Sequence, residues 1–245
     1  MSRLRSRLAR LLPMPLTHVV PVDHPEAPDV VGRRRRVVAS TALAGAGLLG
    51  ASLSTKPGSR EFYLSTGAVA GLWTVGGVVS GPLHLGWIET RDATLRRPVL
   101  TPVATGVAAF GFFYGAALVA RRIPALDAAI ARVLAFADEG DDRLVLLTTL
   151  ANGLGEEVFF RGALYAALGD RHPVVSSTAV YTLATTTTRN PALVLAAGVM
   201  GTLFSMQRRA SGGLQAPLLT HLTWSTLMVR YLPPLFRRAH PRPGR

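Results

Sequence analysis

Seven apolar stretches divide this chain, and they limit what it can fold into more than any other feature of the sequence. They fall at about 37–53, 62–83, 99–120, 144–168, 174–188, 191–206 and 214–232. A helix of roughly 20 apolar residues crosses the hydrocarbon core of a bilayer, and inside lipid every backbone polar group must find a partner within the protein. The pattern therefore predicts an all-α, polytopic transmembrane helix bundle.

Residues 123–137 leave the number of spans open. Their apolar side chains recur at helical spacing, with Asp127 and Arg132 between them. This pattern is typical of an amphipathic helix at the membrane interface, and it also fits a short eighth span. We therefore expect seven or eight spans within one transmembrane domain over residues 37–235.

The low content of charged residues supports a membrane protein. Only 17% of the residues are charged, whereas an ordinary soluble domain carries about 25%. The net charge of +13 would suit a nucleic-acid-binding protein, but the arginines cluster between the apolar stretches and not along one soluble face. We therefore expect a lipid bilayer and no nucleic acid as partner. The chain has no cysteine, which excludes disulfides, thiolate metal sites and a Cys nucleophile.

Basic residues at the N-terminus predict the orientation of the chain. Residues 1–36 contain eight arginines and several prolines, which is typical of a mostly disordered basic arm, and residues 236–245 form a second basic segment. Such an arm either binds anionic lipid headgroups or only enforces topology. The positive-inside tendency places the N-terminus in the cytoplasm. The Arg-, Ala-, Gly- and Val-rich composition is typical of a GC-rich bacterial genome, so we expect a bacterial cytoplasmic membrane.

Three ionisable side chains interrupt the fourth apolar stretch: Glu156, Glu157 and Arg161 lie within six residues. A charge at the centre of a bilayer costs roughly 2.5–3.5 kcal/mol, so ionisable residues retained there indicate function. On a helix, Glu157 and Arg161 are four residues apart and can form an ion pair, which leaves Glu156 to face a cavity as a candidate general base. The alternative is a charge cluster that holds helices together without chemistry.

A second polar point lies in the last apolar stretch, at His221. Four hydroxyl residues surround it: Thr220, Thr223, Ser225 and Thr226. A histidine can donate hydrogen bonds, transfer protons or bind a metal, but a lone histidine in a membrane can equally be a packing residue. A carboxylate on one span and a histidine on another favour a shared polar cavity.

The order of these residues resembles the CPBP family of intramembrane proteases, also called type II CAAX endopeptidases or Abi-like proteins. The family pattern is E-E-x-x-x-R, then aromatic-x-x-x-His, then His-x-x-x-Asn, and the resemblance covers roughly residues 140–232. The first motif matches at Glu156, Glu157 and Arg161, and the third-motif histidine falls on His221. The resemblance implies an all-α endopeptidase in which Glu156 activates water for attack on a peptide bond of a membrane-associated or prenylated substrate. Glu157 and Arg161 would support it.

Two positions depart from the family pattern. The second motif aligns best with Tyr181-Thr-Leu-Ala-Thr185, so Thr185 stands where the family has its second histidine, and Ser225 stands in place of the third-motif asparagine. By the resemblance, the replaced groups polarise the scissile carbonyl or hold its oxyanion. Hydroxyls can donate hydrogen bonds but carry no positive charge, and removal of one oxyanion donor lowers the rate by about 10²–10³. The chain is therefore either a variant protease with hydroxyl donors or a non-catalytic relative that acts as a membrane binding or immunity protein.

The cofactor stays open at this stage. His221 and Glu156 are the candidate ligands for a divalent metal such as Zn²⁺, since only one ligand-type histidine lies near the carboxylates. A third possibility is a small transporter that uses the same buried carboxylates. Transporters of this kind carry broken helices at corresponding places in two halves, and this chain shows no such internal symmetry.

One further motif is set aside. The run Gly45-Ala-Gly47-Leu-Leu-Gly50 matches G-x-G-x-x-G, but a dinucleotide fingerprint needs a preceding strand and an acidic residue about 20 positions later. Neither is present, so we expect these small residues to let helices approach closely.

Overall fold

Helices make up most of the described structure, which confirms the all-α prediction. The computed structural model describes residues 16, 18–20, 24–89, 94–169 and 172–236. The helices are α3 (Pro28–Ser52), α4 (Arg60–Ser80), α5 (Leu100–Ala120), α6 (Pro124–Asp138), α7 (Asp142–Glu156), η1 (Glu157–Leu164), α8 (Tyr165–Leu168), α9 (Pro173–Thr186), α10 (Pro191–Ser211), α11 (Gln215–Tyr231) and η2 (Pro233–Leu235). Every predicted apolar stretch is helical. The short antiparallel pair β1 (Ile88–Glu89) and β2 (Leu95–Arg96) was not predicted.

Polar residues between the apolar stretches set the helix ends. The Ser59 side chain accepts a hydrogen bond from Phe62 N at 3.1 Å and so caps α4. Asp141 caps α7 and Asn190 caps α10 in the same way, each by accepting from two backbone N–H groups. These N–H groups have no partner within their own helix. At the other end of α10, Gly212 adopts the left-handed conformation (φ 67°) that commonly ends a helix.

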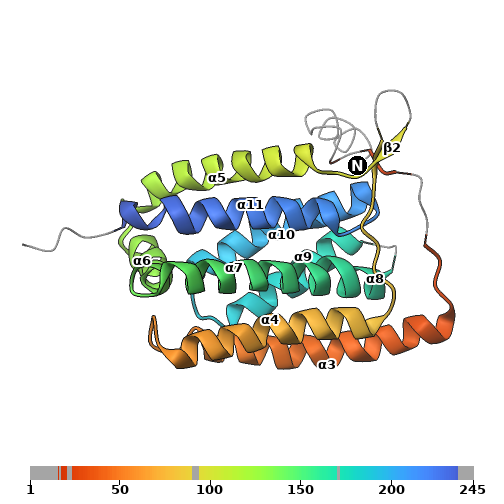
Figure 1. Cartoon of the computed structure of the whole chain (residues 1–245), viewed down its shortest axis with the longest axis horizontal. Coiled ribbons are helices and arrows are strands. Elements are labelled where there is room, and N and C mark those ends of the chain that lie inside the picture. Colours follow the sequence, from red (N-terminus) through yellow and green to blue (C-terminus); the bar gives the residue numbers. More distant parts are fainter. Residues whose placement is uncertain (1–15, 17, 21–23, 90–93, 170–171, 237–245) are drawn as a thin grey trace, which may run out of the picture.

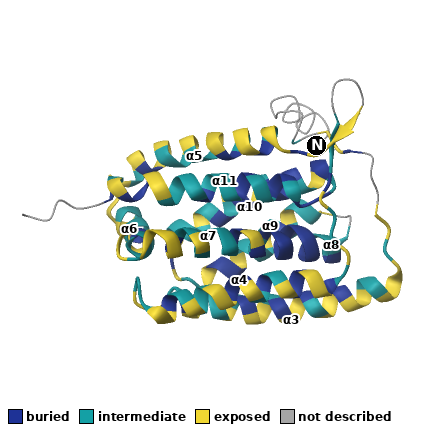
Figure 2. Cartoon of the chain, in the orientation of Figure 1, coloured by how far each residue is buried: buried dark blue, intermediate teal, exposed yellow. Residues whose placement is uncertain are grey.

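Two described helices, α4 and α5, are long and apolar enough to cross a membrane. Figure 2 shows exposed residues along much of α5, and they include Leu100, Val107, Phe112 and Val119. An exposed apolar surface of this extent is typical of contact with lipid or with another protein. The total of seven or eight spans stays a prediction.

The amphipathic helix α6 lies across one end of the bundle, where Figure 1 shows it almost end-on beside α7 and α11. Its 15 residues measure about 22 Å at 1.5 Å per residue. That is shorter than a hydrocarbon core of about 30 Å. The Asn190 side chain donates to Ala129 O at 2.8 Å and attaches α6 to the start of α10. The choice between an interfacial helix and an eighth span stays a prediction.

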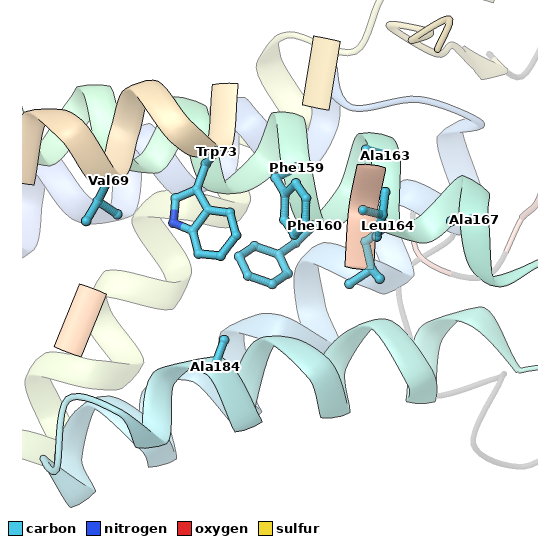
Figure 3. Packing of buried hydrophobic residues seen from close by; sticks show 9 residues of the cluster. Val69, Trp73, Phe159, Phe160, Ala163, Leu164, Ala167 and Ala184 are labelled. Carbon is cyan, nitrogen blue, oxygen red and sulfur yellow. The ribbon is translucent and has the colours of Figure 1, made fainter. Parts of the chain in front are cut away.

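A buried aromatic cluster holds α4 against η1. The ring centroid of Trp73 lies 4.6 Å from that of Phe159 and 5.0 Å from that of Phe160. Figure 3 shows Trp73 reaching these two rings from α4, with Ala184 of α9 on the other side of the cluster. All three aromatic side chains are fully buried. The cluster therefore fixes η1, which begins at Glu157 and directly follows Glu156.

Glycines bring α3 close to its neighbours. A Cβ at Gly45 would lie 2.3 Å from the Trp73 ring, and a Cβ at Gly50 would lie 2.7 Å from Thr187 O. A Cβ at Gly47 would meet open space. Two of the three glycines of the G-x-G-x-x-G run thus allow close approach, which confirms the helix-packing interpretation.

The helix α3 begins at Pro28, so residues 33–36 lie in its first turns and not in an extended arm. Arg34 is fully buried; it forms an ion pair with Glu26 and donates to Ser80 Oγ at 3.1 Å and to Pro82 O at 2.9 Å. A buried charge needs such partners. Arg34 therefore joins the start of α3 to the end of α4. The predicted arm over residues 1–15 and the basic tail after residue 236 lie outside the described residues.

Residues 18–20 and 24–27, here called the N-terminal strap, pack against this same end of the bundle. Val20 N donates to Ala210 O at 3.0 Å, and the His24 ring stacks on the His84 ring with centroids 3.5 Å apart. His18 Nε2 lies 2.5 Å from Glu89 Oε2. The strap thus connects α10, β1 and the segment that follows α4.

Overpacking is the expected result of adding a methyl group at Gly45. We expect Gly45→Ala to lower the free energy of unfolding by about 1–3 kcal/mol, because the Trp73 ring occupies that space. The matched control is Gly47→Ala, which has open space and gains helix propensity. Unfolding in detergent micelles, followed by circular dichroism, measures both. Equal stability of the two variants would contradict the proposed packing.

Acidification is expected to loosen the strap at His84. Partial burial lowers the pKa of His84 below 6.5, and the positive charges of His24, Arg208 and Arg34 act in the same direction, while Glu26 opposes them. Release of the strap removes the stacked His24 ring and its charge, so His84 binds a proton more readily when the strap is released than when it is docked. Docking is fully favoured above pH 6.5 and weakens as the pH falls through 6.5 toward the lowered value.

A single nitroxide label measures this release. Because the chain has no cysteine, the variant Pro25→Cys attaches the label at one exposed position of the strap. We expect the label to become more mobile in electron paramagnetic resonance spectra below about pH 6, the region where an unperturbed histidine titrates. In the His84→Gln background this pH response should be lost. A response that persists in His84→Gln would assign it to another group.

Candidate active site

The two carboxylates lie where α7 changes into a π-helix. α7 ends at Glu156, and η1 then runs for eight residues, all of them buried. The sequence predicted a regular α-helix here. A π-helix has i→i+5 hydrogen bonds. Such segments are rare in proteins, and those that occur often lie at functional sites. α4 packs closely on both sides of the junction, because a Cβ at Gly155 would lie 2.7 Å from Ala70 O and one at Gly77 would lie 2.6 Å from Val158.

Glu157 binds two basic side chains. Its Oε1 lies 3.1 Å from Nη1 of Arg161 and 2.8 Å from Nδ1 of His221. Glu157 and Arg161 are both fully buried, and His221 is nearly so. The ion pair predicted from the spacing of Glu157 and Arg161 is therefore present. The contact with His221 was not predicted, and it joins η1 to α11.

Arg161 connects η1 to two further helices. Its Nη2 donates to Gly201 O on α10 at 3.4 Å. Its guanidinium carbon lies 4.4 Å from the ring centroid of Tyr181 on α9 and 5.0 Å from that of Phe204 on α10. A cation over an aromatic face is attracted by the ring quadrupole. A single buried arginine thus organises the contacts of three elements.

Glu156 is placed differently from Glu157. It is half-buried, and its Oε2 accepts a hydrogen bond from the Tyr181 hydroxyl at 2.6 Å. Among the described residues, the ion pairs of Arg161 and His221 go to Glu157 and none goes to Glu156. The pairing of Glu157 with Arg161 thus matches the expectation from their spacing, and the role of Glu156 stays a prediction.

Tyr181 is the site residue that the sequence analysis missed. It was considered only as the aromatic residue that opens the second motif. A buried Tyr hydroxyl usually has a hydrogen-bond partner, and a phenylalanine would have none. The choice of tyrosine at this position was therefore a signal for a polar neighbour. The structure supplies that partner in Glu156.

His221 is held on several sides. Its ring stacks on Phe204 with centroids 4.7 Å apart, and Trp224 lies 5.9 Å away. Nδ1 faces Glu157, and a carboxylate accepts, so Nδ1 carries the proton. The other nitrogen faces α7, where a Cβ at Gly153 would lie 3.7 Å from it. A carboxylate and a histidine from different helices are thus in contact, and the shared cavity stays a prediction.

The two predicted hydroxyl donors do not reach these groups. The Thr185 hydroxyl donates to Tyr181 O at 2.9 Å, so its proton is used within α9. Threonine commonly bonds to the carbonyl four residues earlier in a helix, which explains this orientation. Ser225 is buried one turn after His221 on α11. In the part of the chain that the structure describes, neither hydroxyl bonds to Glu156, Glu157 or His221.

The donor set does not fit a catalytic metal ion. A catalytic zinc site uses three protein ligands. The described residues contain no group of three or more His, Cys, Asp or Glu side chains placed to hold an ion. Of the two predicted ligands, His221 binds Glu157 through Nδ1 and Glu156 accepts from Tyr181.

Comparison with known protein families gives a match over part of the chain. Residues 143–227 match the family model described as type II CAAX prenyl endopeptidase Rce1-like. The matched region contains the E-E-x-x-x-R motif, Tyr181, Thr185, His221 and Ser225. The resemblance to the CPBP family is thereby confirmed. No curated protein and no solved structure matches the chain.

Removal of the Glu157 carboxylate should lower the free energy of unfolding far more than removal of the Glu156 carboxylate. We expect Glu157→Ala to destabilise the fold by about 3–5 kcal/mol, because Arg161 would stay buried without a counter-charge. Glu156→Ala removes one hydrogen bond and should cost about 1 kcal/mol. Denaturant unfolding in detergent micelles compares the two. A similar loss in both variants would contradict the division of roles.

Proposed function

We propose that this chain is an intramembrane endopeptidase in which Glu156 activates a water molecule for attack on a peptide bond. The observation that carries this proposal is the unequal pairing of the two carboxylates. Glu157 forms an ion pair with Arg161 and contacts His221, whereas Glu156 is half-buried and, among the described residues, accepts from the neutral Tyr181 hydroxyl. The family match over residues 143–227 supports the protease class.

The reaction needs one base and one oxyanion donor. Glu156 takes a proton from water while the water oxygen bonds to the carbonyl carbon, and the carbonyl electron pair moves to oxygen. Glu156 then gives this proton to the amine nitrogen as the carbon–nitrogen bond breaks. His221, oriented through Nδ1 by Glu157, donates to the oxyanion from its other nitrogen when it is protonated. Thr185 on α9 and Ser225 on α11 are the remaining candidate donors.

A membrane-associated protein or peptide, including one with a prenylated tail, is the proposed substrate class. The apolar outer surface of α4 and α5 suits an enzyme that meets its substrate at the bilayer. The arginine-rich N-terminal region supports a cytoplasmic N-terminus in a bacterial membrane.

A second candidate function follows from Thr185. Its hydroxyl bonds within α9, so among the described residues the position of the second-motif histidine supplies no donor to Glu156 or His221. This observation favours a non-catalytic relative that binds membrane proteins or peptides. The two candidates make opposite predictions for the loss of Glu156.

Peptide ends in membranes distinguish the two functions. We compare membranes that contain equal amounts of wild type, Glu156→Gln or Glu139→Gln, the last being an exposed carboxylate at the end of α6. New N-termini should form with wild type and Glu139→Gln. They should be reduced by about 10²–10⁴ in rate with Glu156→Gln, because the general base is gone. Identical profiles in all three membranes would refute proteolysis and favour the binding protein.

A further inference from the structure

The hydrogen bond between Tyr181 and Glu156 has the geometry of a strong contact. Its oxygen–oxygen distance of 2.6 Å falls within the range of about 2.5–2.7 Å that is typical of a hydroxyl bound to an ionised carboxylate. It joins α9 to the last residue of α7, just before the π-helix begins. Among the described residues it is the side-chain contact that fixes the direction of the Glu156 carboxylate.

We propose that Tyr181 is a positioning residue, whose hydroxyl holds one oxygen of Glu156 so that the other faces the attacking water. This inference rests on the proposed function and adds to it the group that orients its base. With Oε2 bound to Tyr181, the proton from water goes to Oε1. Tyr181 keeps its own proton throughout, so the reaction balances with Glu156 as the only group that exchanges one.

The Tyr181 ring is itself held firmly enough to orient a carboxylate. It packs edge-on against Phe160 with centroids 4.8 Å apart, and the Arg161 guanidinium lies over it at 4.4 Å. On the α10 side, a Cβ at Gly201 would lie 3.1 Å from the ring. Contacts from η1 and α10 therefore limit rotation of the ring. A tyrosine loses little freedom when it is fixed in this way, because its side chain has only two rotatable angles before the hydroxyl.

Within the proposed function, the Tyr181–Glu156 hydrogen bond also accounts for a threonine at position 185. The hydroxyl of Thr185 is bonded to the carbonyl of Tyr181, one turn earlier on the same helix. The contact from α9 to the carboxylates is therefore made by the first residue of the motif and not by the fourth. A phenylalanine at 181 would leave Glu156 without any hydrogen bond from α9.

The test compares Tyr181→Phe with Tyr63→Phe. Tyr63 is the matched control, because its hydroxyl is also hydrogen-bonded, to Asp141 N at 2.8 Å, and lies outside the site. The probe is a synthetic quenched peptide copied from a cleavage site that wild type produces in membranes. We expect Tyr181→Phe to lower kcat by roughly 10–100-fold with little change in KM, since the substrate still binds but the base is misaligned. Tyr63→Phe should keep the wild-type kcat.

An infrared measurement separates positioning from general loss of structure. The carboxylate band of Glu156 is identified as the band that Glu156→Gln removes, and Tyr181→Phe should shift it while Tyr63→Phe leaves it in place. A wild-type kcat in Tyr181→Phe would overturn the inference and leave the proposed function intact. A fall in kcat with an unshifted band would also overturn it.

Two outcomes complete the test. Absence of cleavage sites in wild-type membranes would refute the proposed function, and the inference with it. If Tyr181→Phe fails to fold, a fluorinated tyrosine at position 181 replaces it, because it keeps the ring and the hydroxyl but changes the strength of the hydrogen bond. An unchanged band and kcat in that variant would overturn the inference.

Discussion

A buried arginine must have its charge compensated, and the core of this structure is arranged around Arg161. The side chain takes its counter-charge from Glu157, a carbonyl from α10 and two aromatic faces from α9 and α10. Glu157 in turn binds His221, which fixes α11. Both basic side chains bind Oε1 of Glu157, and in the described part of the chain neither forms an ion pair with the neighbouring Glu156. The chemical difference between two adjacent, identical side chains thus comes from one ion pair.

Much of the fold could be predicted from the sequence, because its determinants are local. Each apolar stretch became a helix, and the residues between them supply the caps, such as Ser59 and Asp141. The boundary at Pro28 differed from the prediction, because Arg34 was counted as part of a solvated arm. Its burial depends on Glu26 and on the end of α4, which lies far away in the chain.

The candidate site was predictable in part. The pairing of Glu157 with Arg161 follows from their spacing within one segment, but the contacts of His221 and Tyr181 join helices that are distant in sequence. No periodicity of the chain contains that information. The π-helix is a similar case, since η1 has an ordinary helical composition and its widened turn accompanies close packing against α4. The partner of the Thr185 hydroxyl could not be predicted either. Whether it bonds to the site or to a carbonyl of its own helix depends on the three-dimensional geometry.

Arg208 interacts both with the site and with the histidine on which the N-terminal strap stacks. Its Nε donates to Arg161 O at 2.7 Å, in the middle of the π-helix, and its charge also acts on His84 beneath the strap. Coupling between two sites is reciprocal. A ligand that displaced the backbone at Arg161 would therefore change the proton affinity at the strap, and a proton taken up there would change the affinity for that ligand by the same factor.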